Sequence, residues 1–257
     1  MTTNQTETRE QSTPGAGPGA RRTVWITGAG SGMGRATALR AARSGWTVAL
    51  SGRRREVLEE LAAEIREEGG SALVAPLDVQ DREAVRETAA RIVEELGGID
   101  ALVLAAGLNA PRRRWEDQDL TEFDAIVATN LTAVASTVDA ALPHLRGRGG
   151  QVVVISSFAG WSFQPGAGVA YSASKTALGS LVRTLNQQEA AHGVRSCHLC
   201  PGDVATDFLD QRPSVPDAEA RARMLTAEDI ARTACFVLDS PAHVRIDELV
   251  ISPVSQA

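Results

Sequence analysis

Thr23-Val-Trp-Ile-Thr-Gly-Ala-Gly-Ser-Gly-Met-Gly34 joins a short apolar run to a glycine-rich turn. Gly28, Gly32 and Gly34 remove side chains where the backbone must turn sharply, approach a pyrophosphate and let the following helix close on a sheet. The N-terminus of that helix offers unpaired N–H groups and a favourable dipole to an anion. The stretch therefore predicts a strand, a turn and a helix that together bind a dinucleotide.

Apolar runs of strand length alternate with helical patterns along the rest of the chain. Continuously apolar strands separated by helices are typical of a parallel sheet covered on both faces. We therefore expect an α/β fold with a doubly wound sheet, and we expect helices to stop before Gly69-Gly70 and Gly97-Gly98. The expected strands are Thr23–Thr27, Thr47–Ser51, Ala72–Pro76, Ala101–Ala105, Gln151–Ser156, Val194–Cys200 and Glu248–Ile251.

The chain of 257 residues is long enough for one large α/β domain, which we expect over residues 21–257. Residues 1–20 are polar and rich in proline and glycine, so we expect them to be a disordered tail. Only Phe208–Arg223 breaks the β-α rhythm. Because ligands of open α/β sheets bind beyond the carboxyl ends of strands, a substrate lid at about 207–224 is one interpretation, and an ordinary mobile loop is the other.

Charge and hydropathy exclude several classes of protein. The formal charge of −6 provides no field that would attract nucleic acid or an anionic membrane. No apolar run approaches the roughly 20 residues of a membrane span, and the N-terminus has no apolar secretory core. We therefore expect a cytoplasmic protein with no nucleic-acid or membrane partner.

Cys197-His-Leu-Cys200 superficially resembles a metal or redox pair. It lies in a strand-like run, where positions i and i+3 point to opposite faces. The odd count of three cysteines also argues against a disulfide framework. We expect these cysteines to be small buried core residues, and we expect no metal site.

Basic residues end the second expected strand, in Ser51-Gly-Arg53-Arg54-Arg55. A site for NAD usually places an acid there, which would repel the additional phosphate of NADP. Arg53 can grip that phosphate with a planar, charge-assisted fork, and Arg54 lies next to it. The pattern favours NADP over NAD, whereas Arg55 and Arg35 are expected to be solvated helix residues.

Tyr171-Ser-Ala-Ser-Lys175 spaces a phenol and an amine four residues apart, which places them on one face of a helix. A free phenol has a pKa of about 10, so it needs a neighbouring cation to exchange protons near neutrality. Tyr171 is the single tyrosine of the chain. Beside a nucleotide site, this pair indicates redox chemistry with Tyr171 as the acid/base.

The order and spacing of these motifs resemble the short-chain dehydrogenase/reductase family over about residues 22–253. The shared features are Thr27-Gly-x-x-x-Gly-x-Gly34, Asn130, Ile155-Ser156-Ser157, Tyr171-x-x-x-Lys175 and Pro201-Gly-Asp-Val-Ala-Thr206. The resemblance implies a Rossmann-like sheet of about seven parallel strands and a nicotinamide cofactor. It also implies a homodimer or homotetramer, assembled through the long helices after the fourth and fifth strands.

Residue by residue, the resemblance implies that Tyr171 is the acid/base and that Lys175 is its electrostatic partner. Ser157 would orient the carbonyl, with Ser156 as its rival. Asn130 would support a proton-relay water, although it could instead kink or cap a helix. The implied cofactor contacts are Gly28, Ser31, Gly32, Met33, Gly34, Asp78, Val79, Ala106, Gly107, Tyr171, Lys175, Pro201, Gly202, Val204 and Thr206. Asp78 could alternatively cap the next helix, and Thr206 could be a simple loop residue.

The chain departs from the family at Leu104-Ala-Ala-Gly107, where Asn-Asn-Ala-Gly is usual, so the polar contacts that steady this strand and the adenosine ribose are in question. Its C-terminus, Pro241–Pro253, is similar to that of the branch that oxidises serine-like and other 3-hydroxy acids. Arg112-Arg-Arg114 could hold a substrate carboxylate or form a solvated loop. An apolar pocket could be lined by Trp161, Phe163, Phe208, Leu209 and Met224.

Together these features predict an NADP(H)-dependent oxidoreductase that interconverts a small or medium secondary alcohol and its ketone or aldehyde. The alternatives are an NAD-preferring dehydrogenase of a hydroxy acid or another alcohol, and a protein that senses NADP without turnover. A dehydratase or epimerase of nucleotide sugars is a further alternative, disfavoured because such relatives usually carry a longer C-terminal region.

Overall fold

The computed structural model describes residues 22–256, so the predicted tail at 1–20 lies outside the described residues. Within the described part, seven strands form one sheet in the order β3-β2-β1-β4-β5-β6-β7, and all neighbours are parallel. The strands are β1 (Thr23–Thr27), β2 (Thr47–Ser51), β3 (Ser71–Val74), β4 (Ala101–Leu104), β5 (Gln151–Ile155), β6 (Arg195–Pro201) and β7 (Glu248–Ile251). The predicted doubly wound parallel sheet is confirmed.

Helices connect consecutive strands. They are α1 (Gly32–Arg43), α2 (Arg55–Glu67), α3 (Arg82–Leu96), α4 (Leu120–Val127), α5 (Ala133–Arg146), α6 (Phe158–Trp161), α7 (Val169–Gln188), α8 (Ala218–Ala222) and α9 (Ala227–Leu238). Shorter turns are the π-helical η1 (Ala128–Thr132) and the 3-10 segments η2 (Ala190–His192) and η3 (Asp207–Gln211).

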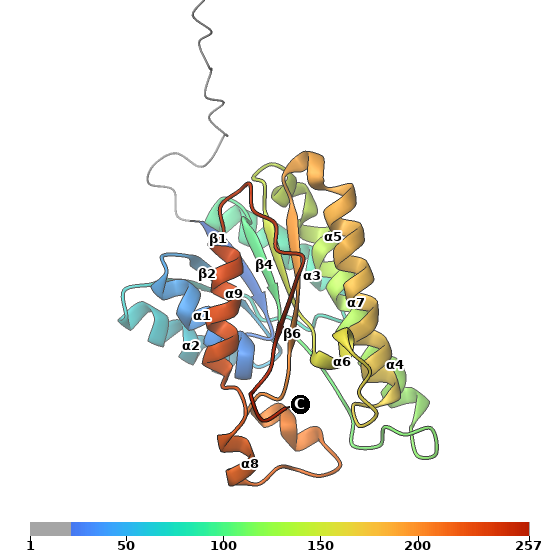
Figure 1. Ribbon diagram of the computed structural model, residues 1–257. Helices are drawn as coiled ribbons and strands as arrows, with labels where there is room; N and C mark the ends of the chain where they lie inside the picture. Colours follow the sequence, from blue (N-terminus) through green and yellow to red (C-terminus); the bar gives the residue numbers. More distant parts are fainter. Residues whose placement is uncertain (1–21, 257) are drawn as a thin grey trace, which may run out of the picture.

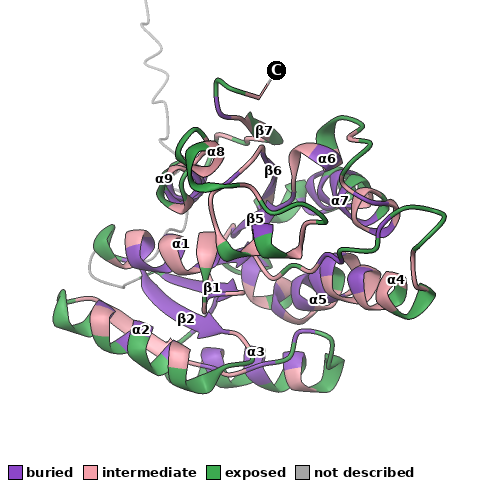
Figure 2. Ribbon diagram, turned by 90° about the horizontal axis from the view of Figure 1, so that it is seen from below, coloured by how far each residue is buried: buried purple, intermediate pink, exposed green. Residues whose placement is uncertain are grey.

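The buried strands divide their side chains between two apolar cores, one on each face of the sheet. In β1, Val24 and Ile26 point into the core that is covered by α1, α2 and α9. Trp25 between them points into the core that is covered by α3, α5 and α7. Figures 1 and 2 show these helices on either side of the buried strands. The continuous apolar runs of the sequence thus follow from burial on both faces.

Local capping sets the helix ends. Asp81 accepts hydrogen bonds from the backbone N–H groups of Glu83 and Ala84 and starts α3, and Gly97 ends it with a left-handed φ of 79°. Thr226 and Asp229 form a reciprocal capping box at the start of α9. The helix ends predicted before Gly69-Gly70 and Gly97-Gly98 are confirmed.

Strand ends were predicted less well than strand positions. β3 covers Ser71–Val74 instead of the expected Ala72–Pro76, and Pro76 has no N–H group with which to extend a ladder. Likewise, β6 extends to Pro201, one residue beyond the expected Cys200.

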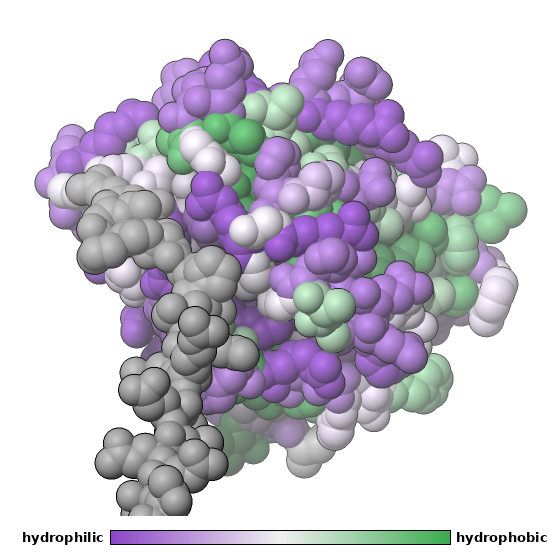
Figure 3. Space-filling view, turned by 90° about the horizontal axis from the view of Figure 1, so that it is seen from above, coloured by the Kyte–Doolittle hydropathy of each residue, from purple (hydrophilic) through white to green (hydrophobic). Residues whose placement is uncertain are grey.

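A continuous helix runs from Leu120 to Arg146 through α4, η1 and α5, and by length and composition it is apolar enough to cross a membrane, which the sequence-based expectation that no apolar run approaches such a span had missed. Its α5 half packs Val134, Val138 and Leu145 into the core beside the sheet, as a core helix does. Figure 3 views the molecule from the end opposite α8. Apolar residues reach its surface on the side where Figure 1 places α4, α5 and α7.

The segment after β6 leaves the sheet, and its two ends are paired with each other. Val204 and Leu225 form an isolated parallel bridge, and the Ala205 N–H donates to the Leu225 carbonyl at 2.8 Å. Between these points lie η3 and α8, below the sheet in Figure 1. We call residues 206–224 the lid segment.

Candidate active site

One cleft of about 290 Å³ opens where the strand order reverses between β1 and β4. This reversal is the position at which open α/β sheets bind ligands. The predicted residues that line it are Gly28, Ser31, Gly32, Met33, Gly34, Arg53, Arg54, Asp78, Val79, Ala106, Gly107, Tyr171, Lys175 and Thr206. Residues that were not predicted as cofactor contacts also line it: Gly30, Gly52, Leu58, Leu77, Gln80, Ala105, Leu108, Thr129, Ile155, Ser156, Asp207 and Phe208.

The glycine-rich turn forms one wall, and its glycines are required by close backbone contacts. A Cβ atom on Gly34 would lie 2.3 Å from the Gly28 carbonyl oxygen, so no side chain fits there. Gly28 has a φ of 67°, and a Cβ atom on it would lie 2.7 Å from the Ala106 backbone nitrogen. The turn therefore packs directly against the end of β4, and α1 begins beside it at Gly32.

The four arginines that were considered as phosphate contacts, Arg35, Arg53, Arg54 and Arg55, separate into two groups. Arg53 and Arg54 line the cleft, and the Arg54 Nη2 donates a long 3.5 Å hydrogen bond to the Gly30 carbonyl. Arg55 lies 3.6 Å from Glu59 on the surface of α2, and Arg35 is ion-paired with Glu64. Two guanidinium groups are thus available at the end of β2, as the sequence predicts.

Asp78 lines the cleft and does not cap α3, because Asp81 fills the capping position. The Asp78 carboxylate instead accepts from the Gln80 backbone N–H at 3.0 Å. The Gln80 side chain donates to the Thr129 hydroxyl at 2.9 Å. Gln80 and Thr129 could have been found from the sequence only as neighbours of Asp78 and Asn130.

Pro201, Gly202 and Val204 are not among the residues that line the cleft, whereas Thr206 is. Gly202 packs beneath the end of the chain, and a Cβ atom on it would lie 2.3 Å from the Gln256 Oε1. That oxygen accepts from the Asp203 backbone N–H at 2.8 Å. The contacts predicted for Pro201, Gly202 and Val204 with a cofactor stay predictions.

Tyr171 and Lys175 share α7, and the Lys175 Nζ lies 5.7 Å from the centroid of the tyrosine ring. The same Nζ donates to the Ile155 carbonyl at the end of β5 at 3.0 Å. Burial lowers the pKa of Lys175 from 10.5 to about 8. The Lys175 ammonium therefore loses its proton more readily than that of an exposed lysine, although it donates a hydrogen bond to the Ile155 carbonyl.

Burial raises the pKa of Tyr171 above its usual value. Opposing effects, in decreasing order, come from hydrogen bonding with the Ser157 hydroxyl and from the charges of Arg212 and Arg113. The cations whose charge acts on the Tyr171 pKa are thus Arg212 and Arg113, which come from two loops, and not the lysine that the sequence predicts. Arg212 could not be assigned to the site from the sequence, because it lies in an irregular segment, whereas Arg113 was named there only as one of the run Arg112-Arg-Arg114.

Ser157, rather than Ser156, reaches the tyrosine. The Ser157 hydroxyl hydrogen-bonds with Tyr171 and also accepts from the Ala159 backbone N–H at 3.2 Å, which starts α6. The Ser156 hydroxyl instead donates to the Lys175 carbonyl at 3.3 Å. Ser157 occupies the N-terminal cap of α6, whereas Ser156 directly follows β5, so the two adjacent serines face different partners.

Asn130 is fully buried in the π-helical turn η1, which interrupts the long helix. Its Oδ1 accepts from the Leu108 N–H at 2.7 Å, and its Nδ2 donates to the Leu108 carbonyl at 2.9 Å and the Ser174 hydroxyl at 3.2 Å. Asn130 thereby steadies the loop after β4 and ties it to α7. These contacts hold the segment that follows Leu104 and Ala105, the two positions at which the resemblance implies amides.

The aromatic residues expected to line an apolar pocket lie in different surroundings. Phe208 lines the cleft, with its ring centroid 6.1 Å from that of Tyr171. Trp161 and Phe163 are 51% and 80% exposed, and Leu209 is 3% exposed in a core contact. The expected five-residue pocket was therefore wrong, because the loop after β5 turns its aromatic residues outward.

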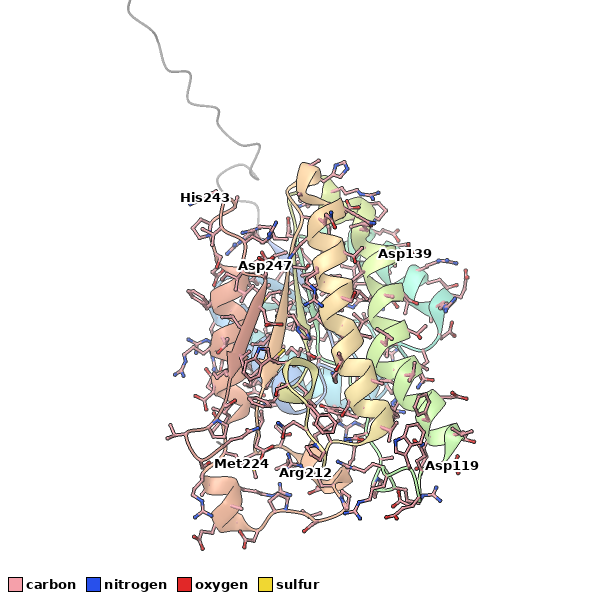
Figure 4. The ribbon with its side chains drawn as sticks, turned by 45° about the vertical axis from the view of Figure 1, so that its right-hand side comes forward. Asp119, Asp139, Arg212, Met224, His243 and Asp247 are labelled. Atoms are coloured by element: carbon pink, nitrogen blue, oxygen red, sulfur yellow. The ribbon has the colours of Figure 1, made fainter. Side chains whose placement is uncertain are left out.

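The lid segment is joined to the loop after β4 at Gln211. The Gln211 Oε1 accepts from the Asn109 N–H at 2.8 Å, and the Gln211 carbonyl accepts from the Arg113 guanidinium. In Figure 4, Arg212 and Met224 lie at the end of the molecule that also holds Asp119. His243 lies at the opposite end. The lid segment and this loop thus meet at the carboxyl ends of the strands.

His198, Cys200 and Glu248 gather behind the site on β6 and β7. The Cys200 Sγ is 3.3 Å from Nδ1 and 3.7 Å from Nε2 of His198, so it lies over the ring face. A metal bound to Nδ1 would lie in the plane of the ring, on the side of Glu248, whose Oε2 lies 3.1 Å from Nδ1. Burial also raises the pKa of the Cys200 thiol to about 12. The three groups therefore do not share one coordination position.

The short chain dehydrogenase family profile matches residues 22–216. Sulfoacetaldehyde reductase 2 from Chromohalobacter salexigens is 35% identical over 241 residues, covering 91% of this chain and 95% of that protein. Glycine betaine reductase ATRR from Emericella nidulans is 35% identical over 92% of this chain, which spans only 19% of that longer protein.

Among solved structures, the alcohol dehydrogenase from the archaeon Thermococcus sibiricus, complexed with 5-hydroxy-NADP, superposes with a TM-score of 0.84. It is 32% identical, and the alignment covers 92% of this chain and 98% of the other.

Proposed function

The chain belongs to the short-chain dehydrogenase family, and we propose that it is an NADP(H)-dependent oxidoreductase that interconverts a small alcohol and its aldehyde or ketone. The observation that carries the proposal is that one cleft joins the glycine-rich turn to Tyr171 and Lys175. A phosphate-binding turn and a proton exchanger in one cavity fit hydride transfer coupled to proton transfer.

The residues present fit a nicotinamide dinucleotide. The turn from Gly28 to Gly34 leaves no room for side chains near its backbone, and the N-terminus of α1 faces the same cleft. When bound, the nicotinamide supplies or accepts the hydride. Arg53 and Arg54, which line the cleft at the end of β2, would hold the 2′-phosphate that distinguishes NADP from NAD. The NADP-type ligand of the Thermococcus sibiricus dehydrogenase supports this choice.

The chain's own residues handle the proton. In reduction, the Tyr171 hydroxyl protonates the carbonyl oxygen, and its raised pKa keeps it protonated at neutral pH. Ser157, which hydrogen-bonds with that hydroxyl, orients the same oxygen. Asn130 holds the loop after β4 against α7. In oxidation the proton moves in the opposite direction, from the alcohol to Tyr171.

The same proposal covers the assembly and location of the protein. The helix from Leu120 to Arg146 carries more apolar side chains than its packing against the core buries. The apolar side chains left at the surface support a homodimer or homotetramer that assembles through this helix and α7. Cys197, Cys200 and Cys235 are free and buried, a pattern that supports a reducing compartment such as the cytoplasm.

A panel of small aldehydes, ketones and alcohols, followed by nicotinamide absorbance with NADPH and with NADH, tests the proposal. We expect carbonyl-dependent oxidation of NADPH by the wild type and none by Tyr171→Phe. Tight binding of NADP without turnover of any compound would instead favour a sensing protein.

A further inference from the structure

Three consecutive arginines follow β4, and the structure separates the middle one from its neighbours. Arg112 lies 3.0 Å from Glu122 and 3.5 Å from Asp119, and Arg114 lies 3.5 Å from Glu116 at the surface. Arg113 is only 9% exposed. Within residues 22–256, no carboxylate lies within ion-pair distance of its guanidinium.

Arg113 is instead held by backbone carbonyls. Its Nε donates to the Ala110 carbonyl at 2.8 Å, its Nη1 to the Gly166 carbonyl at 3.4 Å, and its Nη2 to the Gln211 carbonyl. A guanidinium has five N–H donors, so these contacts with described residues leave one on each terminal nitrogen. The two remaining N–H donors belong to a buried guanidinium. Burying a cation costs free energy unless an anion pairs with it.

A second arginine, which is half-buried, shows what is particular about Arg113. Arg195 also donates to carbonyls only, those of Ser240, Pro241 and Val244 after α9. Its partners follow a single helix end, where a cation is stabilised by the helix dipole. The carbonyls around Arg113 come from its own loop, from the loop before α7 and from the end of η3, and the charge of Arg113 acts on the Tyr171 hydroxyl.

Arg113 and Arg212 act on Tyr171 from the side of the lid segment. The charges of both guanidinium groups act on the tyrosine hydroxyl and on each other. Arg212 is paired with Asp203, so its charge is balanced locally, whereas that of Arg113 is not. Tyr171 and Arg113 also line a small pocket of about 10 Å³ beside the cleft, and the two carboxylates that line it, Asp119 and Glu122, are paired with Arg112. A positive charge beside the proton exchanger would attract an anion bound there.

We infer that the substrate carries an anionic group, a carboxylate or a sulfonate, and that Arg113, assisted by Arg212, binds this group while Tyr171 handles the carbonyl. Phe208, whose ring is tilted by 44° to that of Tyr171, provides an apolar wall for a short carbon chain between the two groups. The inference rests on the proposed function and names its substrate class. It makes Arg113 the residue that determines specificity, with Arg112 and Arg114 as paired surface residues.

The test compares aldehydes of similar size and different charge, with NADPH as the cofactor. The probes are succinic semialdehyde and its methyl ester, sulfoacetaldehyde, and the cationic betaine aldehyde. We expect the wild type to favour the two anions over the ester and to use the cation least. Comparing succinic semialdehyde with sulfoacetaldehyde shows which of the two anionic groups fits better.

Arg113→Gln should lower kcat/KM for the anionic aldehydes by roughly 10- to 100-fold, as expected for the loss of a hydrogen bond to a charged group. The methyl ester should change by less than about threefold. Arg114→Gln, on the same loop but paired at the surface, is the matched control and should match the wild type on all probes. Arg113→Lys should restore part of the preference, because the charge is kept while the fork is lost.

A purely structural role would lower kcat/KM for every probe by the same factor. A wild type that reduces all four aldehydes equally would overturn the inference and leave the proposed function standing. Failure to reduce any carbonyl compound in the wider panel would overturn the proposed function itself. If Arg113→Gln does not fold, Arg212→Gln provides the same comparison, and an unchanged charge preference in that variant would also overturn the inference.

Binding of an anion at Arg113 can also be measured without turnover. Methanesulfonate should raise the unfolding temperature of the wild type above that in sodium chloride of equal ionic strength, and Arg113→Gln should abolish the difference. Equal effects in both proteins would contradict the inference.

Discussion

The Lys175 ammonium lies one helical turn from Tyr171, 5.7 Å from the centroid of its ring, and donates its hydrogen bond to the Ile155 carbonyl. The lysine is thereby fixed at the end of β5, at the base of the cleft. Its depressed pKa of about 8 shows how strongly burial opposes the charge that the proposed chemistry uses.

Removing the Tyr171 hydroxyl should abolish turnover and preserve cofactor binding. Tyr171→Phe deletes only the proton exchanger, so the rate should fall by at least roughly 100-fold, the usual contribution of general acid catalysis. Steady-state rates with NADPH, together with fluorescence titration of the cofactor, check both expectations. An active Tyr171→Phe variant would refute the mechanism.

Lys175 should make the stability of the ligand-free protein depend on pH. Because burial lowers its pKa from 10.5 to about 8, the folded protein binds fewer protons than the unfolded chain between these values. The free energy of unfolding should therefore rise with pH across that window, by up to about 3 kcal/mol relative to Lys175→Met. Urea unfolding of both proteins on either side of the window measures this difference, and parallel pH profiles would show that the lysine titrates normally.

Arg53 should determine the preference for NADP. Arg53→Ala should weaken the binding of NADP by roughly 10-fold or more, since a charge-assisted contact is lost, and should leave NAD nearly unchanged. Arg55→Ala is the matched control, because Arg55 lies next in the sequence but pairs with Glu59 on the outside of α2. An equal loss for both cofactors would assign Arg53 a role in folding instead.

Gly34 should tolerate no side chain. In Gly34→Ala the new Cβ would meet the Gly28 carbonyl oxygen at 2.3 Å, so the turn must open. We expect a loss of roughly 2 kcal/mol or more in the free energy of unfolding, and loss of cofactor binding. In Gly147→Ala the nearest atom would be 3.7 Å away and φ is −71°, so this control should be neutral or slightly stabilising. Similar stability of the two variants would contradict the close packing of the turn.

Patterns that depend on neighbours along the chain could be predicted from the sequence. The glycine-rich turn, the four-residue spacing of Tyr171 and Lys175, and the alternation of apolar strands with helices are all local, and the structure shows each of them. Strand ends were less predictable, because pairing with a neighbouring strand decides where a ladder stops. The outward position of Trp161 and Phe163 could not be foreseen, since nothing local separates an exposed aromatic residue from a buried one.

The sequence by itself determined the fold, the glycine-rich turn and the pairing of Tyr171 with Lys175 on one helix, because backbone sterics and helical periodicity act over a few residues. Only the tertiary structure decided which of three identical neighbours, Arg112, Arg113 and Arg114, lies buried beside Tyr171. The burial of a charge depends on carbonyls supplied by loops that are distant in sequence, here those of Gly166 and Gln211. Such long-range contacts leave no local pattern in the sequence. They form where the loop before α7 and the lid segment pack against the loop after β4.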